Sequence, residues 1–505
     1  MSSAISPLLL VTFFPLVGFV IVLFFNDERP DQRAAIRWTA LVTSLLTFLI
    51  ALWLLSQFDP KNADLQLVIR IPWVQIAGVT VSFFMGVDGL SILLVLLNTF
   101  LIPIALLSSW DGIHERVKGF TLWFLLLEVG MTGVFLAQDL VLFFVFWEFS
   151  LVPMYFLIGI WGHGQRVAAA FKFFLYTMTG SILMMLAILW LGIQGGSFAL
   201  PDLVAAHNIA PVLQTWLFIA FAVAFAVKVP MWPLHSWLPD AHTEAPTAGS
   251  VILAGVMLKM GAYGLLRINL SLFPDATLRL APWLALLAVI GIIYGAIVAY
   301  PQKNMKRLVA YSSVSHLGFV VLGLFALNPQ GLEGSILQMV NHGLSTGALF
   351  LLVGMIYERR HTLEMDQLGG IWRVMPLYGG LALTFILSSI GLPGLNGFVG
   401  EFTILLGSFG SKVLGNPWFA GVATIGVILA AIYLLHMFEK VFLGPVVRAE
   451  NRTLKDLTAR EILTLAPLLV MIFWIGLYPK PFFMLIAPAV EKLTASIQVA
   501  SLAMH

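Results

Sequence analysis

The stretch Val212-Leu-Gln-Thr-Trp-Leu-Phe-Ile-Ala-Phe-Ala-Val-Ala-Phe-Ala-Val-Lys228-Val-Pro230-Met-Trp-Pro233 joins a long apolar run to one lysine and two prolines. An apolar run of about 20 residues is typical of a membrane-spanning helix. Each proline removes a backbone N–H and clashes with the carbonyl four residues before it, so we expect the helix to break after Lys228. Irregular backbone at membrane depth is tolerated only where protein or water covers it. This stretch therefore predicts a broken helix inside a membrane bundle.

The composition of the whole chain supports the same interpretation. Of its 505 residues, 60% are hydrophobic and only 10% are charged, whereas a soluble domain carries about 25% charged residues. The net charge of +2 gives no indication of a nucleic-acid partner. The absence of cysteine excludes disulfides, thiolate-bound zinc, thiolate-bound iron–sulfur clusters and cysteine nucleophiles. We therefore expect an all-α polytopic membrane protein.

Fourteen apolar segments are long enough to cross a bilayer. The first is interpreted as a retained helix, because no basic region precedes it and no convincing cleavage site follows it. The predicted segments are 5–25, 35–56, 84–109, 117–137, 139–161, 167–194, 212–238, 247–270, 281–300, 306–327, 331–357, 375–410, 417–443 and 462–480.

Basic residues divide unevenly between the two sides of the predicted bundle. The loops after odd-numbered segments hold 17 Lys and Arg residues, and the opposite side holds 7. Because cytoplasmic loops are enriched in Lys and Arg, we expect the odd loops to face the cytoplasm and both termini to face outside. The three remaining basic residues fall inside membrane segments and are Lys172, Lys228 and Lys259.

A second break divides the twelfth segment, where Gly391-Leu-Pro393-Gly394-Leu-Asn-Gly397 interrupts the apolar run. Segment 7 is the fourth of segments 4–8, and segment 12 is the fourth of segments 9–13. Because successive helices cross the membrane in alternating directions, an offset of five gives corresponding helices of the two sets opposite directions. Paired broken helices are typical of inverted repeats with a transport site between them. We therefore predict N-terminal helices 1–3 in 1–112, a first repeat (helices 4–8) in 113–272, a second repeat (helices 9–13) in 273–445, and helix 14 with the C-terminus in 446–505.

Six ionisable residues fall in the interior of separate predicted helices. A buried charge in a membrane costs several kcal/mol unless it is paired or neutralised. One such residue can be a structural hydrogen-bonding group, but a series on different helices favours a proton relay. The residues are Glu148, Lys228, Lys259, His316, His342 and Glu401.

The pair Glu148 and Lys228 is the expected driving element of that relay. Two unit charges ~4 Å apart at an effective dielectric of ~20 attract by about 4 kcal/mol. An attraction of that size corresponds to about 3 pKa units. A change of a few ångström in their separation is therefore expected to move a proton from Lys228 to a neighbour.

Other polar residues are assigned less specific roles. Glu128, Lys172 and His235 are possible accessory groups of the relay, and Asp88 and Asp139 are expected to cap helices or to lie at the membrane interface.

A loop metal site is an alternative interpretation of His235, Asp240, His242 and Glu244, but a polar loop at a half-helix end is preferred. The chain shows no phosphate-binding loop or dinucleotide fingerprint in a credible context, so no cofactor and no metal are expected in it.

Several motifs together resemble one family. They are Ala224-Phe-Ala-Val-Lys228-Val-Pro-Met-Trp-Pro-Leu-His-Ser-Trp-Leu-Pro-Asp-Ala-His-Thr-Glu-Ala-Pro-Thr-Ala-Gly-Ser250, Phe146-Trp-Glu148, Lys306-Arg-Leu-Val-Ala-Tyr-Ser-Ser-Val-Ser-His316 and Phe398-Val-Gly-Glu401-Phe. Over roughly residues 80–445 the chain resembles the antiporter-like membrane subunits of respiratory complex I, the NADH:quinone oxidoreductase. The acid at Glu401 favours the M type (chain 4), because the L and N types carry lysine at that point.

The resemblance implies a fourteen-helix fold, two inverted repeats and a role in moving protons. It places the helix 5 glutamate at Glu148, the broken-helix lysine at Lys228, the helix 8 lysine at Lys259 and the terminal acid at Glu401. FMN, iron–sulfur clusters, NADH and quinone are then expected in other subunits, and this chain is expected to hold no redox centre. The resemblance implies a hetero-oligomer in which L- and N-like chains are the neighbours. The implied location is the bacterial plasma membrane, and a mitochondrial inner membrane is less favoured.

Three alternatives remain open at this point. The chain also resembles the D-type subunit of multi-subunit sodium/proton antiporters and the equivalent chain of membrane-bound hydrogenases. A related complex that takes electrons from ferredoxin uses similar chains. A passive membrane scaffold, whose buried charges only fix helix pairing, is the alternative of a different class.

Overall fold

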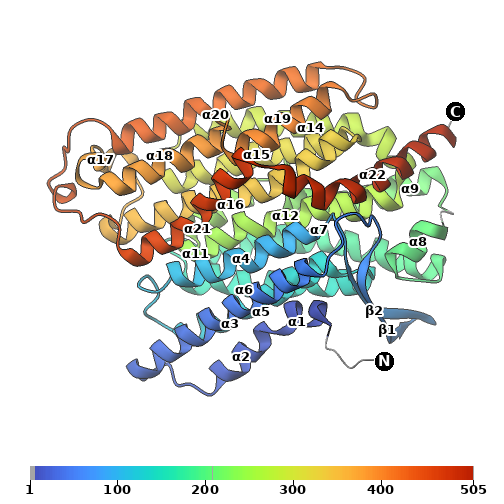
Figure 1. Cartoon of the computed structure of the whole chain (residues 1–505), viewed down its shortest axis with the longest axis horizontal. Helices are drawn as coiled ribbons and strands as arrows, with labels where there is room; N and C mark the ends of the chain where they lie inside the picture. The colour runs from blue at the N-terminus through green and yellow to red at the C-terminus, as the bar shows by residue number, and fades with distance from the viewer. Residues whose placement is uncertain (1–5, 207–208, 504–505) are drawn as a thin grey trace.

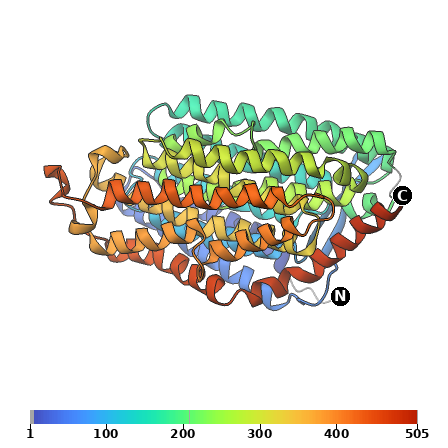
Figure 2. The same ribbon diagram turned by 90° about the horizontal axis from the view of Figure 1, so that it is seen from above.

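The computed structural model describes residues 6–206 and 209–503, which form an elongated bundle of roughly parallel helices (Figures 1 and 2). The elements of the first half are α1 (Pro7–Phe13), α2 (Pro15–Leu23), α3 (Pro30–Ser56), β1 (Gln66–Ile76), β2 (Val79–Val87), α4 (Ile92–Ser108), α5 (Val117–Leu136), α6 (Leu140–Trp161), α7 (Arg166–Gly195), α8 (Leu200–Ala206), α9 (Pro211–Lys228) and α10 (Trp237–Glu244).

The second half begins with a long composite helix and continues to the described end of the chain. Its elements are α11 (Thr247–Ile252), η1 (Leu253–Met257), α12 (Leu258–Gly264), η2 (Leu265–Asn269), α13 (Leu270–Leu272), α14 (Pro274–Ala299), α15 (Met305–Phe325), α16 (Pro329–Arg360), η3 (Met365–Gln367), α17 (Ile371–Val374), α18 (Pro376–Ile390), α19 (Asn396–Phe409), α20 (Trp418–Phe442), η4 (Ala449–Asn451), α21 (Ala459–Leu477) and α22 (Lys480–Ala503).

The fold class predicted from the sequence is confirmed. Among the described residues, 12 helices are long and apolar enough to cross a membrane, and three shorter apolar helices accompany them (Pro7–Leu23, Ile92–Ser108 and Pro376–Ile390). The expected total of about fourteen crossings is consistent with this set. Residue 5, the first of the predicted segment 5–25, lies outside the described residues.

Burial separates a central group of helices from the outer ones. In the most apolar 18-residue window of each helix, all residues of Thr247–Leu272 and of Pro329–Arg360 and 94% of those of Met305–Phe325 are buried, whereas only 39% are buried in Arg166–Gly195 and in Trp418–Phe442. In a membrane bundle the outer helices face lipid, so polar side chains are tolerated best on the central ones. The three central spans carry Lys259, His316 and His342.

Both predicted breaks are present. The helix α9 ends at Lys228, and the next regular helix, α10, begins only at Trp237. The helix α18 ends at Ile390, and α19 starts at Asn396. The residue after α18, Gly391, has a φ of +82°, a left-handed conformation that glycine adopts without a Cβ clash.

The composite helix 247–272 contains two wide π-helical turns, η1 and η2. Single π turns inside α-helices occur mostly at functional sites. Both turns flank the short α12, which carries Lys259.

Four features differ from the expected all-α arrangement. The first predicted segment is divided into α1 and α2 at Pro15, which begins α2. Residues 66–87 form an antiparallel hairpin in which Ile76 pairs with Val79, so the third crossing starts at Ile92 instead of residue 84. Most residues of β1 are exposed and most residues of β2 are buried, so β2 is the strand that packs on the bundle. A further helix, α22, follows the fourteenth predicted segment.

Candidate functional site

Lys228 occupies the last turn of α9 at the edge of the first break. Its side chain is 1% exposed, and its ammonium has no hydrogen-bond partner among the described residues. The Nζ atom lies 5.2 Å from the ring centroid of Trp147 and 5.6 Å from that of Phe173. These rings therefore hold the lysine by cation–π attraction, which is worth about 2 kcal/mol or more when desolvated.

Glu148 lies next to Trp147 on α6 and is half-buried. Its Oε1 atom also lacks a hydrogen-bond partner within the described part of the chain, and no ion pair joins it to Lys228 there. The direct Glu148–Lys228 contact expected from the sequence is thus not formed in this conformation. The aromatic rings of Trp147 and Phe173 contact the ammonium in its place.

Lys259 begins a continuous polar chain in the centre of the bundle. It is 0% exposed, and its Nζ lies 2.6 Å from His342 Nδ1 and also donates to the carbonyl of Ala254. The carbonyl belongs to the π turn η1, so the wide turn supplies an acceptor for the buried ammonium. The ring centroids of His342 and His316 are 6.0 Å apart.

The chain continues from His316 to Glu401. His316 Nδ1 lies 2.9 Å from Glu401 Oε1, and the same oxygen accepts from Gln338 Nε2 at 3.1 Å. Tyr433 Oη lies 3.3 Å from His316 Nε2. Both nitrogens of His316 are therefore engaged, and Glu401, only 3% exposed, has two partners.

A small polar cavity adjoins the two histidines. Its volume is about 10 Å³, and its wall includes His316, His342, Ser345 and Ser388. The Ser345 and Ser388 hydroxyls are 2.7 Å apart. A cavity of this size with several polar partners has room for about one water molecule. One water there would connect His342 Nε2, which has no partner among the described residues, to the neighbouring polar groups.

The predicted accessory residues lie apart from this chain. Lys172 pairs with Asp240 at 2.7 Å, and Arg307 pairs with the same carboxylate at 3.0 Å. His235 packs edge-on against Tyr294 at 4.9 Å. These contacts place Asp240 in an ion-pair cluster on α10, which is a short helix in place of the expected polar loop and in which His242 is fully buried. Within the described residues, no group of three or more His, Asp or Glu side chains is arranged to hold a metal ion.

Glu128 is buried at 0% exposure, and both its carboxylate oxygens lack a partner among the described residues. Its carbonyl accepts from Thr132 at 2.8 Å, but its side chain contacts none of the relay residues by a hydrogen bond.

Sequence reasoning missed two kinds of polar residue. Gln338 and Tyr433 are uncharged, so nothing in the sequence distinguished them from ordinary packing residues. Arg267 was counted as a loop residue and Asp88 as a cap, yet they form a buried ion pair in which Arg267 Nη1 lies 2.6 Å from Asp88 Oδ2. The spacing of Lys259, Tyr263 and Arg267 at four-residue intervals is the signal that places them on one side of a helix.

Outside the membrane segments, one ion pair connects the hairpin to α8. Arg70 on β1 donates to both oxygens of Asp202, at 3.1 and 2.5 Å. These hydrogen bonds hold the pKa of the Asp202 carboxyl below its ordinary value, while partial burial acts in the opposite direction.

Comparison with known proteins identifies relatives along nearly the whole chain. Residues 137–432 match the family model described as NADH:quinone oxidoreductase/Mrp antiporter, TM. NADH-quinone oxidoreductase subunit M of Rhodobacter capsulatus is 44% identical, with 96% of this chain and 95% of the relative covered. NADH-ubiquinone oxidoreductase chain 4 of Arabidopsis thaliana is 43% identical, with 93% of each covered.

Solved structures give the same result. A chain in the structure of respiratory complex I from Thermus thermophilus with bound NADH superposes with a TM-score of 0.87 at 32% identity, and the match covers 97% of this chain and 99% of that chain. A chain of the membrane-bound sulfane sulfur reductase shares the fold, with a TM-score of 0.82 at 24% identity and coverage of 93% and 76%. The sequence matches and the superposition together show that this chain belongs to the antiporter-like membrane subunit family of NADH:quinone oxidoreductase, and within it to the subunit M (chain 4) group.

Proposed function

We propose that the chain translocates protons as the M-type membrane subunit of a proton-pumping NADH:quinone oxidoreductase. The observation that carries this proposal is the buried polar chain Lys259–His342–His316–Glu401, in which the first and last links measure 2.6 and 2.9 Å and the two histidine rings between them are 6.0 Å apart. Family membership supports the assignment to this oxidoreductase, because relatives at 40–44% identity over about 96% of the chain bear that name.

The geometry suggests how a proton moves along the chain. Lys259 donates toward His342 Nδ1, so a proton accepted there can leave from His342 Nε2 on the opposite side of the ring. One water in the adjoining cavity would carry it the remaining distance toward His316, whose Nδ1 faces Glu401. Glu401 is then the terminal exchange group toward the outer side.

The input to this chain is the Lys228 region. Lys228 faces aromatic rings in the present conformation, and Glu148 carries an unpartnered oxygen close by in the fold. A movement that brings the two charges to ~4 Å would add about 4 kcal/mol of attraction at an effective dielectric of ~20. We infer that redox chemistry in other subunits drives this change and that this chain holds no redox centre.

The remaining features of the assignment are proposals that follow from family membership. FMN, iron–sulfur clusters, NADH and quinone are placed in other subunits, and L- and N-like chains are the neighbours. The membrane is proposed to be the bacterial plasma membrane with both termini outside. The two inverted repeats, 113–272 and 273–445, are proposed to meet at the polar chain.

The decisive experiment measures proton translocation and electron transfer separately in the assembled complex carrying Glu401→Gln. The glutamine keeps the size of the side chain and one acceptor oxygen but cannot take up or release a proton, so we expect the number of protons moved per electron to fall. The matched control is Glu439→Gln, which changes an exposed carboxyl near the end of α20. An unchanged proton yield in Glu401→Gln would contradict the relay.

A sodium/proton antiporter subunit is the second candidate, because the matching family model includes the Mrp antiporters. Mass spectrometry of the intact detergent-solubilised assembly distinguishes the two. Co-purifying flavin and iron–sulfur proteins are expected for the oxidoreductase, and an assembly of membrane subunits alone would favour the antiporter.

A further inference from the structure

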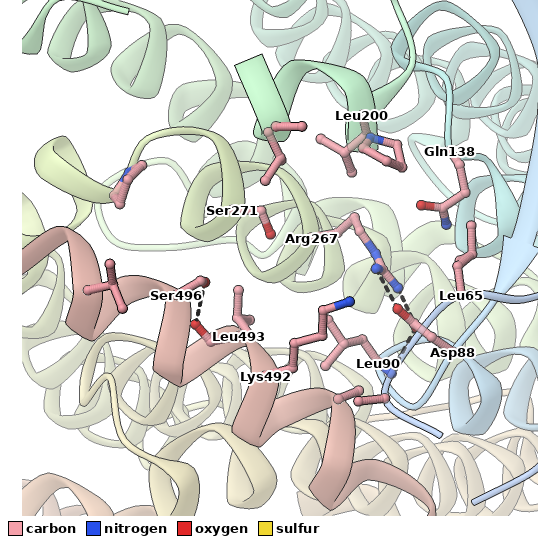
Figure 3. Close-up of a pocket in the computed structure, with 17 residues that line it drawn as sticks. Leu65, Asp88, Leu90, Gln138, Leu200, Arg267, Ser271, Lys492, Leu493 and Ser496 are labelled. Atoms are coloured by element: carbon pink, nitrogen blue, oxygen red, sulfur yellow. Dashed lines mark hydrogen bonds and ion pairs between the residues drawn. The ribbon is translucent and has the colours of Figure 1, made fainter. Parts of the chain in front are cut away.

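A large cavity lies outside the polar chain. It has a volume of about 670 Å³ and opens between the loop before the hairpin, α8, the end of the composite helix 247–272 and α22 (Figure 3). None of Lys228, Lys259, His342 or Glu401 lines it. Ligand pockets in proteins are typically ~300–1,000 Å³ in volume, so this cavity has the capacity for a sizeable molecule.

The charged groups of Asp88 and Arg267 in the cavity wall pair with each other. Both carboxylate oxygens of Asp88 accept from Arg267, and Arg267 Nε donates to Tyr263 Oη at 3.0 Å. Figure 3 shows the Asp88 and Arg267 side chains turned toward each other in this way. Asp88 and Arg267 therefore leave few unpaired donors or acceptors for a ligand.

Beside this ion pair, the wall carries the side-chain amide of Gln138. The side chain of Gln138 is 2% exposed, and its amide nitrogen has no acceptor among the described residues. A buried unpaired N–H costs roughly 1–3 kcal/mol. An acceptor supplied by a ligand would remove that cost.

A positive charge stands at the mouth of the cavity. Lys492 on α22 points toward the cavity in Figure 3, and its ammonium lies 2.5 Å from Asp64. The Lys492 side chain is 61% exposed and that of Asp64 is 73% exposed. Exposed ion pairs are weak, so the ammonium is free to turn toward an anionic ligand.

Most of the wall is apolar. Leucine side chains line it from three separate parts of the chain, and the apolar surface continues outward to Val499, which is 67% exposed. The leucines are Leu65, Leu90, Leu200 and Leu493. A ligand that fits this wall has a long apolar body and a compact acceptor group with negative charge.

We propose that this cavity binds an anionic phospholipid, with an acyl chain along the leucine wall and the phosphate toward Gln138 and Lys492. The surrounding bilayer supplies this class of molecule, and a soluble phosphate compound would leave the apolar wall unfilled. The bound lipid would link α22 to α8 and to the loop that precedes the hairpin. This proposal is independent of the reaction that the assembly catalyses.

The test is photolabelling of the purified, delipidated assembly with phosphatidylglycerol that carries a diazirine in its acyl chain. Labelled peptides are expected from residues 63–65, 200–205 and 489–499. Ser496→Phe, which places a ring into the cavity from an exposed position on α22, should lower this labelling at least five-fold. Met484→Phe, on the same helix but outside the cavity wall, should leave it unchanged.

The headgroup preference is tested with Lys492→Gln, which should reduce labelling, and with Lys480→Gln on the same helix as its control. Unlabelled phosphatidylglycerol should compete, whereas phosphatidylcholine and glycerol phosphate should not. Equal competition by phosphatidylcholine would overturn the anionic preference, and competition by glycerol phosphate would replace the lipid with a soluble phosphate compound. Labelling that persists in Ser496→Phe and Lys492→Gln would overturn the site.

Discussion

Aromatic rings, and not a carboxylate, hold Lys228 in this conformation. The Trp147 indole also donates to Ser181 Oγ at 3.1 Å, which fixes the ring beneath the ammonium. Cation–π attraction is weaker than a close ion pair in a membrane interior. The Lys228 ammonium is therefore held loosely enough that a modest rearrangement can bring it into contact with the Glu148 carboxylate.

Glu148→Gln tests whether that transfer matters. Removal of the carboxylate charge leaves Lys228 without a negative partner, so we expect proton translocation by the assembled complex to fall about tenfold or more. The measurement is the initial rate of proton uptake into inverted membrane vesicles during NADH oxidation. Full translocation by an assembled Glu148→Gln complex would show that the pair has no role.

The residues of the buried polar chain could be predicted from the sequence because each charged group is energetically costly in a membrane. That argument found Lys259, His342, His316 and Glu401, which the structure brings into one chain. It had no means of finding Gln338 or Tyr433, because neutral polar groups carry little penalty. The separation of Glu148 and Lys228 also depends on the packing of Trp147, which no spacing in the sequence encodes.

Close approach of two central helices sets the length of the Lys259–His342 contact. A Cβ on Gly343 of α16 would lie 2.8 Å from the carbonyl oxygen of Gly255 in η1. Only a residue without a side chain permits this distance. The glycine therefore holds the composite helix and α16 at the spacing that the buried ammonium requires.

Gly343→Ala should push those helices apart. We expect a loss of about 1–3 kcal/mol in the free energy of unfolding, as for other overpacked cores, and slower proton translocation in the complex that still assembles. Gly347→Ala, one turn further along α16, is the control, because its Cβ would meet nothing nearer than Val251 Cγ1 at 3.8 Å. Equal behaviour of the two variants, in thermal unfolding and in translocation, would refute this explanation.

The hairpin is anchored by a pH-dependent contact. Because Arg70 holds the pKa of Asp202 below its ordinary value, the contact is fully formed above the ordinary carboxyl pKa and is lost as the pH falls through the lowered value. We expect hydrogen exchange in β1 to accelerate as the pH is lowered through the acidic range, after correction for the intrinsic rate. Asp202→Asn should remove most of this pH dependence, and its persistence in that variant would exclude the Arg70–Asp202 contact as the cause.

The broken helices were predictable and the hairpin was not, for physical reasons. Pro230 has a second proline three residues later, and Pro393 lies between Gly391 and Gly394, so each cluster favours an interruption. The isolated Pro103 and Pro153, in contrast, lie inside continuous helices. The residues at 84–87 are mostly apolar and continue into an apolar helix, and their pairing with residues 66–70 selects the strand. Contacts with distant parts of the chain decide whether such a segment forms a helix or a strand. The periodicity of the local sequence gives no information about these contacts.

The orientation of the assembled bundle can be tested with single cysteines, because the chain contains none. A cysteine at Lys412 should react with a membrane-impermeant maleimide added outside intact cells, since this position is on the predicted outer face. A cysteine at Lys303, on the predicted cytoplasmic face, should react only after the membrane is opened. The reverse pattern would invert the proposed topology.

The two ends of the described chain lie at the same end of the bundle, where α1 begins and α22 finishes (Figures 1 and 2). This arrangement agrees with an even number of crossings. The hairpin, α8 and the large cavity are at that end too, so the proposed lipid site and the proposed outer surface coincide.

The wide turns of the composite helix carry a consequence for how this protein tolerates insertions and deletions. A π turn holds one residue more than an α turn, so η1 behaves as a single-residue insertion that the fold has absorbed. Removal of one residue from 253–257 would tighten the turn to α geometry and leave Lys259 on its present side of the helix. The Ala254 carbonyl would then return to the helical ladder, and a change that preserves every charge in the chain would still take an acceptor away from the buried ammonium.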